Sequence, residues 1–222
     1  MLLQRFFKIE DRRISRCRIA QACLCLMLLG GCAAGPGSRS QPDAPIADGE
    51  PGLARAIPPR AMTLFEQAVA IMSTGDIVEA QFRFQEFLLQ YPDYPGAHVN
   101  LAIIHARNGN DRAAQGSITD ALIIDPEHPA ALNLLGMLLR RQGRFLDAES
   151  AYMKAVTANP EYALAHYNLG VLNELYLRRF DVALLHFEYY QLLTNEDKQV
   201  EKWITDLKRR VQANQRTANV TE

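Results

Sequence analysis

Residues 136–170 read GMLLRRQGRFLDAESAYMKAVTANPEYALAHYNLG, and this stretch carries the pattern that decides the fold. It opens and closes on glycine, 34 residues apart, and the same interval recurs along the chain. Self-similarity at a fixed period of roughly 20–50 residues is typical of repeat architectures. The positions that share the interval are Gly75, Gly109 and Gly143; Ala80, Ala114 and Ala148; Pro92, Pro126 and Pro160; Phe84, Ile118 and Tyr152; and Ala68, Ala102, Gly136 and Gly170.

Each class of repeated residue has a physical role in a pair of helices. Glycine ends the first helix, where the turn requires a positive φ. Small residues let the paired helices approach closely, and the bulky residues fill the space between them. Proline cannot continue a helix and therefore marks the start of the next unit. Period-2 alternation is absent, so no strand is expected. The predicted helices are 61–73, 77–90, 96–107, 111–124, 129–141, 145–158, 163–177 and 180–193.

This pattern resembles the tetratricopeptide repeat, a helix–turn–helix unit of the same period. The clearest single match is Tyr167-Asn168-Leu169-Gly170. The resemblance implies an all-α solenoid of about four repeats over residues 61–194. The fourth repeat departs from the pattern, because Tyr176-Leu177-Arg178-Arg179 stands where a turn glycine is expected. One extra residue separates Gly170 from Ala183, so the turn either extends the helix or bulges it.

A final helix is predicted to close the solenoid. Apolar residues recur at helical spacing after the fourth repeat, namely Val200, Trp203, Ile204, Leu207 and Val211. Thr194 and Asp197 form a plausible capping pair at its start. We therefore expect a capping helix over 195–213 that covers the fourth repeat, and a loose tail over 214–222.

The N-terminal segment has the pattern of a secretion signal. A basic start precedes the apolar run 19–29, which is too short to cross a hydrocarbon core of about 30 Å. Leu29-Gly30-Gly31-Cys32 resembles the lipobox of bacterial lipoproteins. That resemblance implies removal of 1–31 and a lipidated Cys32 that carries palmitate. The alternative is an ordinary signal peptide with an incidental cysteine. Residues 32–60 are rich in Pro and Gly and are expected to form a flexible, disordered tether.

The predicted localisation is the bacterial cell envelope. Cys17, Cys23 and Cys25 fall within the removed segment, so the mature chain would contain no disulfide. Ala33 follows the lipidated cysteine, where lipoproteins retained at the inner membrane have an aspartate. We therefore expect a lipid anchor in the outer membrane, with the protein facing the periplasm.

Motifs for chemistry are missing from the sequence. It contains no phosphate-binding glycine loop, nucleophile elbow or zinc-protease helix, and none of the five histidines forms an i, i+4 pair on a helix. The net charge of −1 provides no general attraction for nucleic acid. We therefore expect neither a cofactor nor a metal, no nucleic acid or small-molecule substrate, and no enzymatic activity. The alternative is an envelope enzyme whose site has no recognisable motif.

The resemblance implies a binding groove lined by the first helices of the repeats. Asparagine amides there could bind a peptide backbone, and arginines could pair with a carboxylate. The arginines could equally be solvated cations at helix ends. The predicted groove residues are Phe65, Val69, Val99, Asn100, Ile103, Arg107, Asn133, Met137, Arg140, Arg141, Tyr167, Asn168, Val171 and Glu174.

Together these features predict a non-catalytic adaptor or scaffold that binds a protein or peptide of the cell envelope. Envelope lipoproteins of similar layout include those associated with TonB-type transport systems, which the turn at 175–180 and the helix around Trp203 resemble most. Others are pilotin-like factors that assist assembly of a type IV pilus or its secretin, and these are the alternative interpretation.

Overall fold

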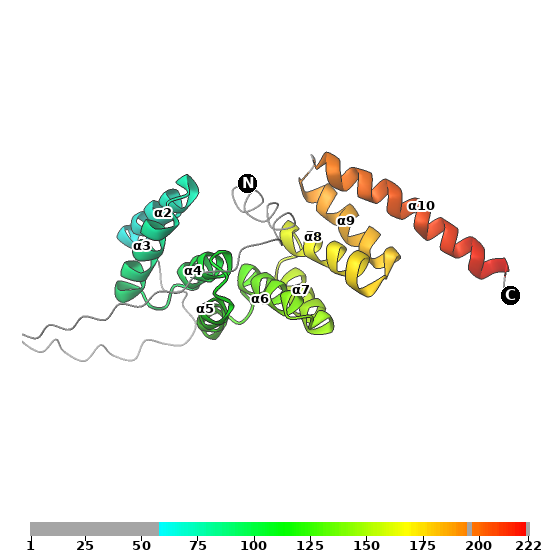
Figure 1. Cartoon of the computed structure of the whole chain (residues 1–222). Helices are drawn as coiled ribbons and strands as arrows, with labels where there is room; N and C mark the ends of the chain where they lie inside the picture. The colour runs from blue at the N-terminus through cyan, green and yellow to red at the C-terminus, as the bar shows by residue number, and fades with distance from the viewer. Residues whose placement is uncertain (1–57, 195–196, 221–222) are drawn as a thin grey trace, which may run out of the picture. The chain divides into compact units, whose positions relative to one another are not determined.

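The computed structural model describes residues 58–194 and 197–220, with side chains as far as residue 216. These residues form helices and no strand (Figure 1). The predicted segment 1–31, Cys32 and most of the predicted tether lie outside the described residues. The helices are α2 (Pro59–Thr74), α3 (Ile77–Gln90), α4 (Pro95–Arg107), α5 (Asp111–Ile124), α6 (Pro129–Arg141), α7 (Phe145–Ala158), α8 (Ala163–Leu172), the π-helix η2 (Asn173–Leu177), α9 (Phe180–Thr194) and α10 (Lys198–Val220).

The helices pack as consecutive pairs, which Figure 1 shows as hairpins: α2 with α3, α4 with α5, α6 with α7, and α8 with α9. First helices of neighbouring pairs also touch, from α4 to α6 and from α6 to α8. The described residues therefore form an all-α solenoid of helix pairs, as the repeat period predicts. α2 begins at Pro59, slightly before the predicted start.

Glycine turns separate the two helices in the first three pairs. Gly75, Gly109 and Gly143 have φ values of 93°, 73° and 76°, in the left-handed region that favours glycine. The residue after the glycine then caps the second helix in two of these pairs. The Asp76 and Asn110 side chains accept hydrogen bonds from the backbone N–H groups of Glu79 and Ala113.

In the fourth pair, a π-helix precedes the turn that lacks a glycine. The extra residue is absorbed by η2, in which α8 widens before the turn. Arg178 then takes the left-handed conformation at φ 58°, in the place that glycine occupies in the other repeats. The sequence predicted a helix extended or bulged at this point, and the bulge is what forms.

Small residues on the first helices make room for large ones on the second helices. A Cβ atom added to Gly136 would lie 2.5 Å from the Tyr152 ring, and one added to Gly170 would lie 2.6 Å from the Phe187 ring. Both aromatic side chains are fully buried. The repeated glycines at these two positions are therefore required by packing.

The helix α10 closes the fourth repeat, as predicted. Val200, Ile204 and Leu207 join a buried cluster with Phe187 and Tyr190. Asp197, rather than the predicted pair with Thr194, caps the helix by accepting from the Gln199 and Val200 N–H groups, while Thr194 donates to the Tyr190 carbonyl.

The helix α10 is longer than predicted. It runs to Val220, whereas a loose tail was expected over 214–222. The prediction followed the apolar stripe, which stops at Val211, but the polar residues beyond it continue the helix. Among the described residues, no helix has both the length and the apolar character needed to cross a membrane.

Candidate functional site

The predicted groove residues form what we call the first-helix surface, and the structure buries much of it. Several side chains of α4, α6 and α8 in this set are buried. The buried members are Val99, Ile103, Asn133, Met137, Asn168 and Val171.

The asparagines of this surface bond within the protein. The Asn168 side-chain amide donates to the Asn133 side-chain oxygen over 2.9 Å, and Asn133 is only 1% exposed. The Asn100 amide donates to the Gly96 carbonyl over 2.8 Å. Asn133 and Asn168 therefore join α6 to α8, whereas Asn100 is half-buried. Binding of a peptide backbone by these asparagines stays a prediction.

The arginines of this surface have different environments. Arg141 contacts Asp111 of the preceding repeat at 2.5 Å and donates to the Ala106 carbonyl, so it links two repeats. Arg107 is exposed. The guanidinium of Arg140 lies 5.8 Å from the Tyr176 ring centre, and its buried Nε has no hydrogen-bond partner in the structure. Of the three predicted groove arginines, Arg141 therefore links two repeats, Arg107 is exposed, and Arg140 lies beside Tyr176.

The remaining members lie at the two ends of the surface. Phe65 packs against Phe84, Phe87 and Tyr94, while Val69 is half-buried. Glu174 binds Arg210 of α10 at 3.0 Å. The Tyr167 ring lies 6.2 Å from the Trp203 ring of the same helix, in a tilted arrangement. The capping helix therefore engages the residues that the sequence assigned to a partner at this end.

A buried pair of histidines joins α8 to α9. His166 Nε2 lies 3.0 Å from the Pro160 carbonyl, so this nitrogen donates. In the neutral ring Nδ1 then accepts, and His186 Nδ1, at 3.2 Å, donates to it. Burial lowers the pKa of both rings, and for His186 burial and the neighbouring His166 lower the pKa to about 4. The pair is thus held neutral and serves packing.

Metal ligands do not gather within the described ranges. No group of three or more His, Cys, Asp or Glu side chains that could hold a metal ion occurs there.

Exposed apolar side chains lie mainly on the second helices, which sequence reasoning missed. Val78 and Leu89 are 84% and 86% exposed. Their spacing places them on one helix face. This helical periodicity is the feature of the sequence that could have identified them. We call Val78, Phe82 and Leu89 the α3 patch, and Leu185, Tyr189 and Leu192 the α9 patch.

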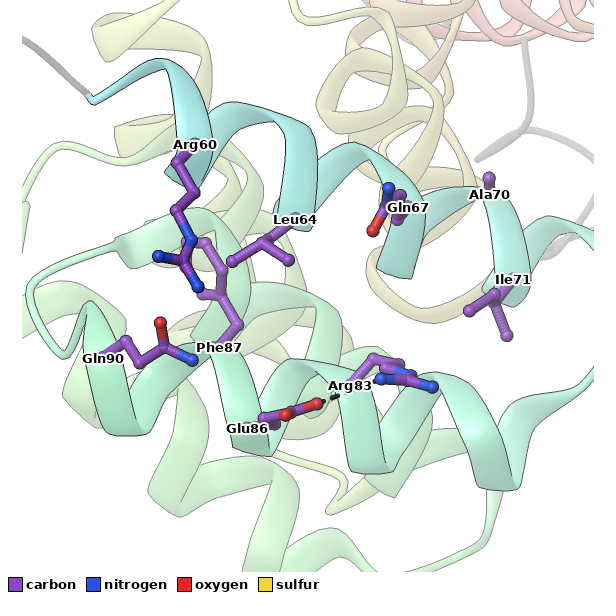
Figure 2. A pocket seen from close by; sticks show the side chains of 9 residues that line it. All are labelled: Arg60, Leu64, Gln67, Ala70, Ile71, Arg83, Glu86, Phe87 and Gln90. Atoms are coloured by element: carbon purple, nitrogen blue, oxygen red, sulfur yellow. Dashed lines mark hydrogen bonds and ion pairs between the residues drawn. The ribbon is translucent and has the colours of Figure 1, made fainter.

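A hollow of about 480 Å³ lies between α2 and α3 (Figure 2). Its apolar lining includes Leu64, Ile71 and Phe87, and Arg60, Gln67 and Glu86 contribute polar groups. Figure 2 shows Arg60 and Leu64 reaching from α2 toward α3. We call this the α2–α3 hollow. No motif in the sequence indicates it, because its residues differ from their equivalents in later repeats.

Comparison with known proteins agrees with the repeat assignment. The tetratricopeptide-repeat family model matches residues 107–162 and 133–193 of this chain. No curated protein matches the sequence.

Solved structures share the same fold. The pilF protein of Pseudomonas aeruginosa is 22% identical, with a TM-score of 0.61 over 69% of each chain. MamA is 18% identical, with a TM-score of 0.52 over 66% of this chain and 80% of that one. A chain of Naa15/Naa10 bound to HypK-THB is 19% identical, with a TM-score of 0.55 over 67% of this chain and 22% of that one. At these identities the likeness is one of fold, and the described chain is a tetratricopeptide-repeat solenoid.

Proposed function

We propose that this protein is a non-catalytic scaffold that binds a protein partner in the bacterial cell envelope. Cys32 carries its lipid anchor, the outer membrane holds it, and the repeats face the periplasm. The partner is a protein or peptide, and the scaffold serves an envelope assembly or a TonB-type transport system. The lipobox resemblance supports the anchor, and the solenoid fold supports the binding role.

The observation that carries the binding role is the exposed apolar surface of the second helices. Each patch lies along one helix face. The residues of the α3 patch are spaced i, i+4 and i+11, and those of the α9 patch are spaced i, i+4 and i+7. Apolar side chains gathered in this way mark surfaces that other proteins cover. Because six of the fourteen first-helix residues are buried within the solenoid, the patches are the stronger candidates for contact with a partner.

The experiment is capture from envelope extracts with the full-length protein as bait. We expect Phe82→Ser with Leu89→Ser to lose a partner that the wild type retains, because the apolar contact area is removed. The matched control is Lys154→Ser with Thr157→Ser, at exposed positions of α7. Equal capture by all three baits would contradict a role for the α3 patch.

The first-helix surface is tested separately by Arg107→Glu. This change replaces neither member of the Arg141–Asp111 pair between repeats. Loss of capture in this variant alone would move the binding site back to the surface predicted from the sequence.

The pilotin-like alternative differs from this proposal in the partner, which would be a secretin or pilus subunit. The fold that this chain shares with Pseudomonas aeruginosa pilF favours considering it. The same capture experiment separates the two, because mass spectrometry identifies which envelope component is retained.

A further inference from the structure

The α2–α3 hollow lies on the face that later repeats use for stacking. A shift of 34 residues maps Gln67 onto Leu101 and Ala70 onto Ile104. Leu101 and Ile104 are buried, whereas Gln67 and Ala70 are exposed. The same shift maps Arg60 onto Tyr94.

Tyr94 shows what covers this face in the second repeat. Its ring packs 4.9 Å from that of Phe65 and 5.1 Å from that of Phe87, so the first repeat covers it. Within the described residues the hollow is lined by α2 and α3 alone. It is a stacking face that no described helix occupies.

The opposite end of the solenoid shows what kind of element closes such a face. There a single helix, α10, packs Val200, Ile204 and Leu207 onto the last pair. Its other side is polar and exposed, with Lys202, Thr205 and Arg209. One amphipathic helix is therefore sufficient to cover an end of this fold.

The shape of the hollow selects a convex occupant. Two copies of this chain meeting face to face would each bring a hollow of about 480 Å³, and the space between them would remain unfilled. A helix instead presents a ridge of side chains that enters the hollow and contacts Leu64, Ile71 and Phe87.

Charge indicates one further feature of the occupant. Arg83 is already paired, with Glu79 at 2.7 Å and Glu86 at 3.2 Å. Arg60 extends over the hollow from the first turn of α2, and no carboxylate of the described residues pairs with it. A carboxylate on the occupant can supply that partner.

We propose that the α2–α3 hollow binds an amphipathic helix of a partner protein, with apolar residues at i, i+4 and i+7 and a carboxylate that pairs with Arg60. This deepens the proposed scaffold function and rests on it. The hollow borders the α3 patch, since the Arg83 guanidinium lies 5.9 Å from the Phe82 ring centre. Substitutions at Arg60 and Ile71 on α2 test the hollow without changing a residue of the patch.

The test measures binding of synthetic helical peptides to the purified full-length protein. The probe is a peptide of about 14 residues with leucines at i, i+4 and i+7 and a glutamate at each end. We expect it to bind, and we expect Arg60→Glu to weaken it about tenfold, because a charge reversal replaces attraction with repulsion. A peptide with lysines in place of the glutamates should recover binding to the Arg60→Glu variant.

Further variants distinguish binding in the hollow from binding elsewhere on the protein. Ile71→Asp should weaken both peptides, and Arg112→Glu on the exposed side of α5 should change neither. Circular dichroism checks that each variant is folded. If Ile71→Asp unfolds the protein, the proposal is decided by the binding of the glutamate and lysine peptides to the Arg60→Glu variant, whose substitution is at an exposed position. No binding, or equal binding to all variants, would overturn the proposal.

Two other occupants would also overturn it. One is a second copy, shown by a dimer that Arg60→Glu dissociates. The other is the chain's own N-terminal segment, shown by a photoreactive group at Gln67 that cross-links to residues before 58. Failure here with intact capture in the α3-patch experiment leaves the scaffold function standing, so the two failures are distinguishable.

Discussion

At the scale of single residues, the positions that recur every 34 residues predicted backbone conformation well and solvent exposure poorly. The turn glycines and the small residues at Gly136 and Gly170 have the roles that the sequence indicates. Asn133 is the contrasting case, since helical periodicity points it toward a groove but α8 covers it through Asn168. Periodicity specifies a helix face, whereas burial depends on which neighbouring helix lies against that face.

Arg178 is predicted to limit the stability of the fourth turn. A non-glycine residue in the left-handed region costs about 1–2 kcal/mol. Arg178→Gly removes this strain but also removes the contact of the guanidinium with the Phe180 ring at 5.6 Å. The net effect should be a rise in the free energy of unfolding of up to about 1 kcal/mol.

The matched reverse change is Gly143→Ala. The added Cβ meets nothing within 4 Å, so only backbone strain at φ 76° should lower stability. Urea denaturation measures both variants. A destabilised Arg178→Gly protein would contradict the role assigned to this turn.

The histidine pair is predicted to make stability depend on pH. The pKa of His186 is about 4 in the folded protein, below the ordinary value of 6.5 that applies when the chain unfolds. Its contribution is therefore fully present above about pH 6.5 and is lost as the pH falls toward about 4, with a slope of at most about 1.4 kcal/mol per pH unit. His186→Gln should flatten this part of the profile of unfolding free energy against pH. An unchanged slope in the variant would show that other groups control it.

At the scale of secondary-structure elements, the prediction succeeded where residue spacing alone determines the helix. The bounds of α3, α5, α6 and α7 are those predicted. The length of α10 was not predicted, because the apolar stripe ends at Val211. Beyond it, the polar residues Asn214 and Gln215 line a hollow with Arg178, Phe180 and Asp181 of the fourth pair. The α2–α3 hollow was not predicted either, since it arises from an unoccupied stacking face and not from a motif.

Close packing between paired helices should make the small residues of the second helices intolerant of bulk. Ala114 and Ala148 are fully buried at equivalent positions. Replacing Ala148 by Leu should cost about 1–3 kcal/mol, because the added atoms overpack the contact. Thermal unfolding compares this variant with Ser150→Leu, an exposed change on the same helix.

Glu149, which precedes Ser150 on α7, has a structural contact of its own. Its carboxylate binds Arg179 at 2.8 Å and so joins α7 to the fourth turn. Equal melting temperatures for Ala148→Leu and Ser150→Leu would contradict the packing described for α6 and α7.

At the scale of the whole molecule, the proposed architecture joins a lipid anchor to a solenoid that binds a partner. The anchor is predicted from Leu29-Gly30-Gly31-Cys32, which lies outside the described residues. Cys32→Ala should abolish labelling with palmitate and leave an unprocessed or soluble precursor. Metabolic labelling and membrane fractionation check this, and unchanged labelling would remove Cys32 as the attachment site.

The central claim is that this solenoid is a protein-binding scaffold with its contact surface on the second helices. The most direct test places a photoreactive amino acid at Leu89, at Leu192, or at the control position Thr157, in the full-length protein in living cells. We predict a discrete cross-linked partner at Leu89 or Leu192 that is absent at Thr157. The same cross-linking pattern at all three positions, or none at any, would contradict the claim.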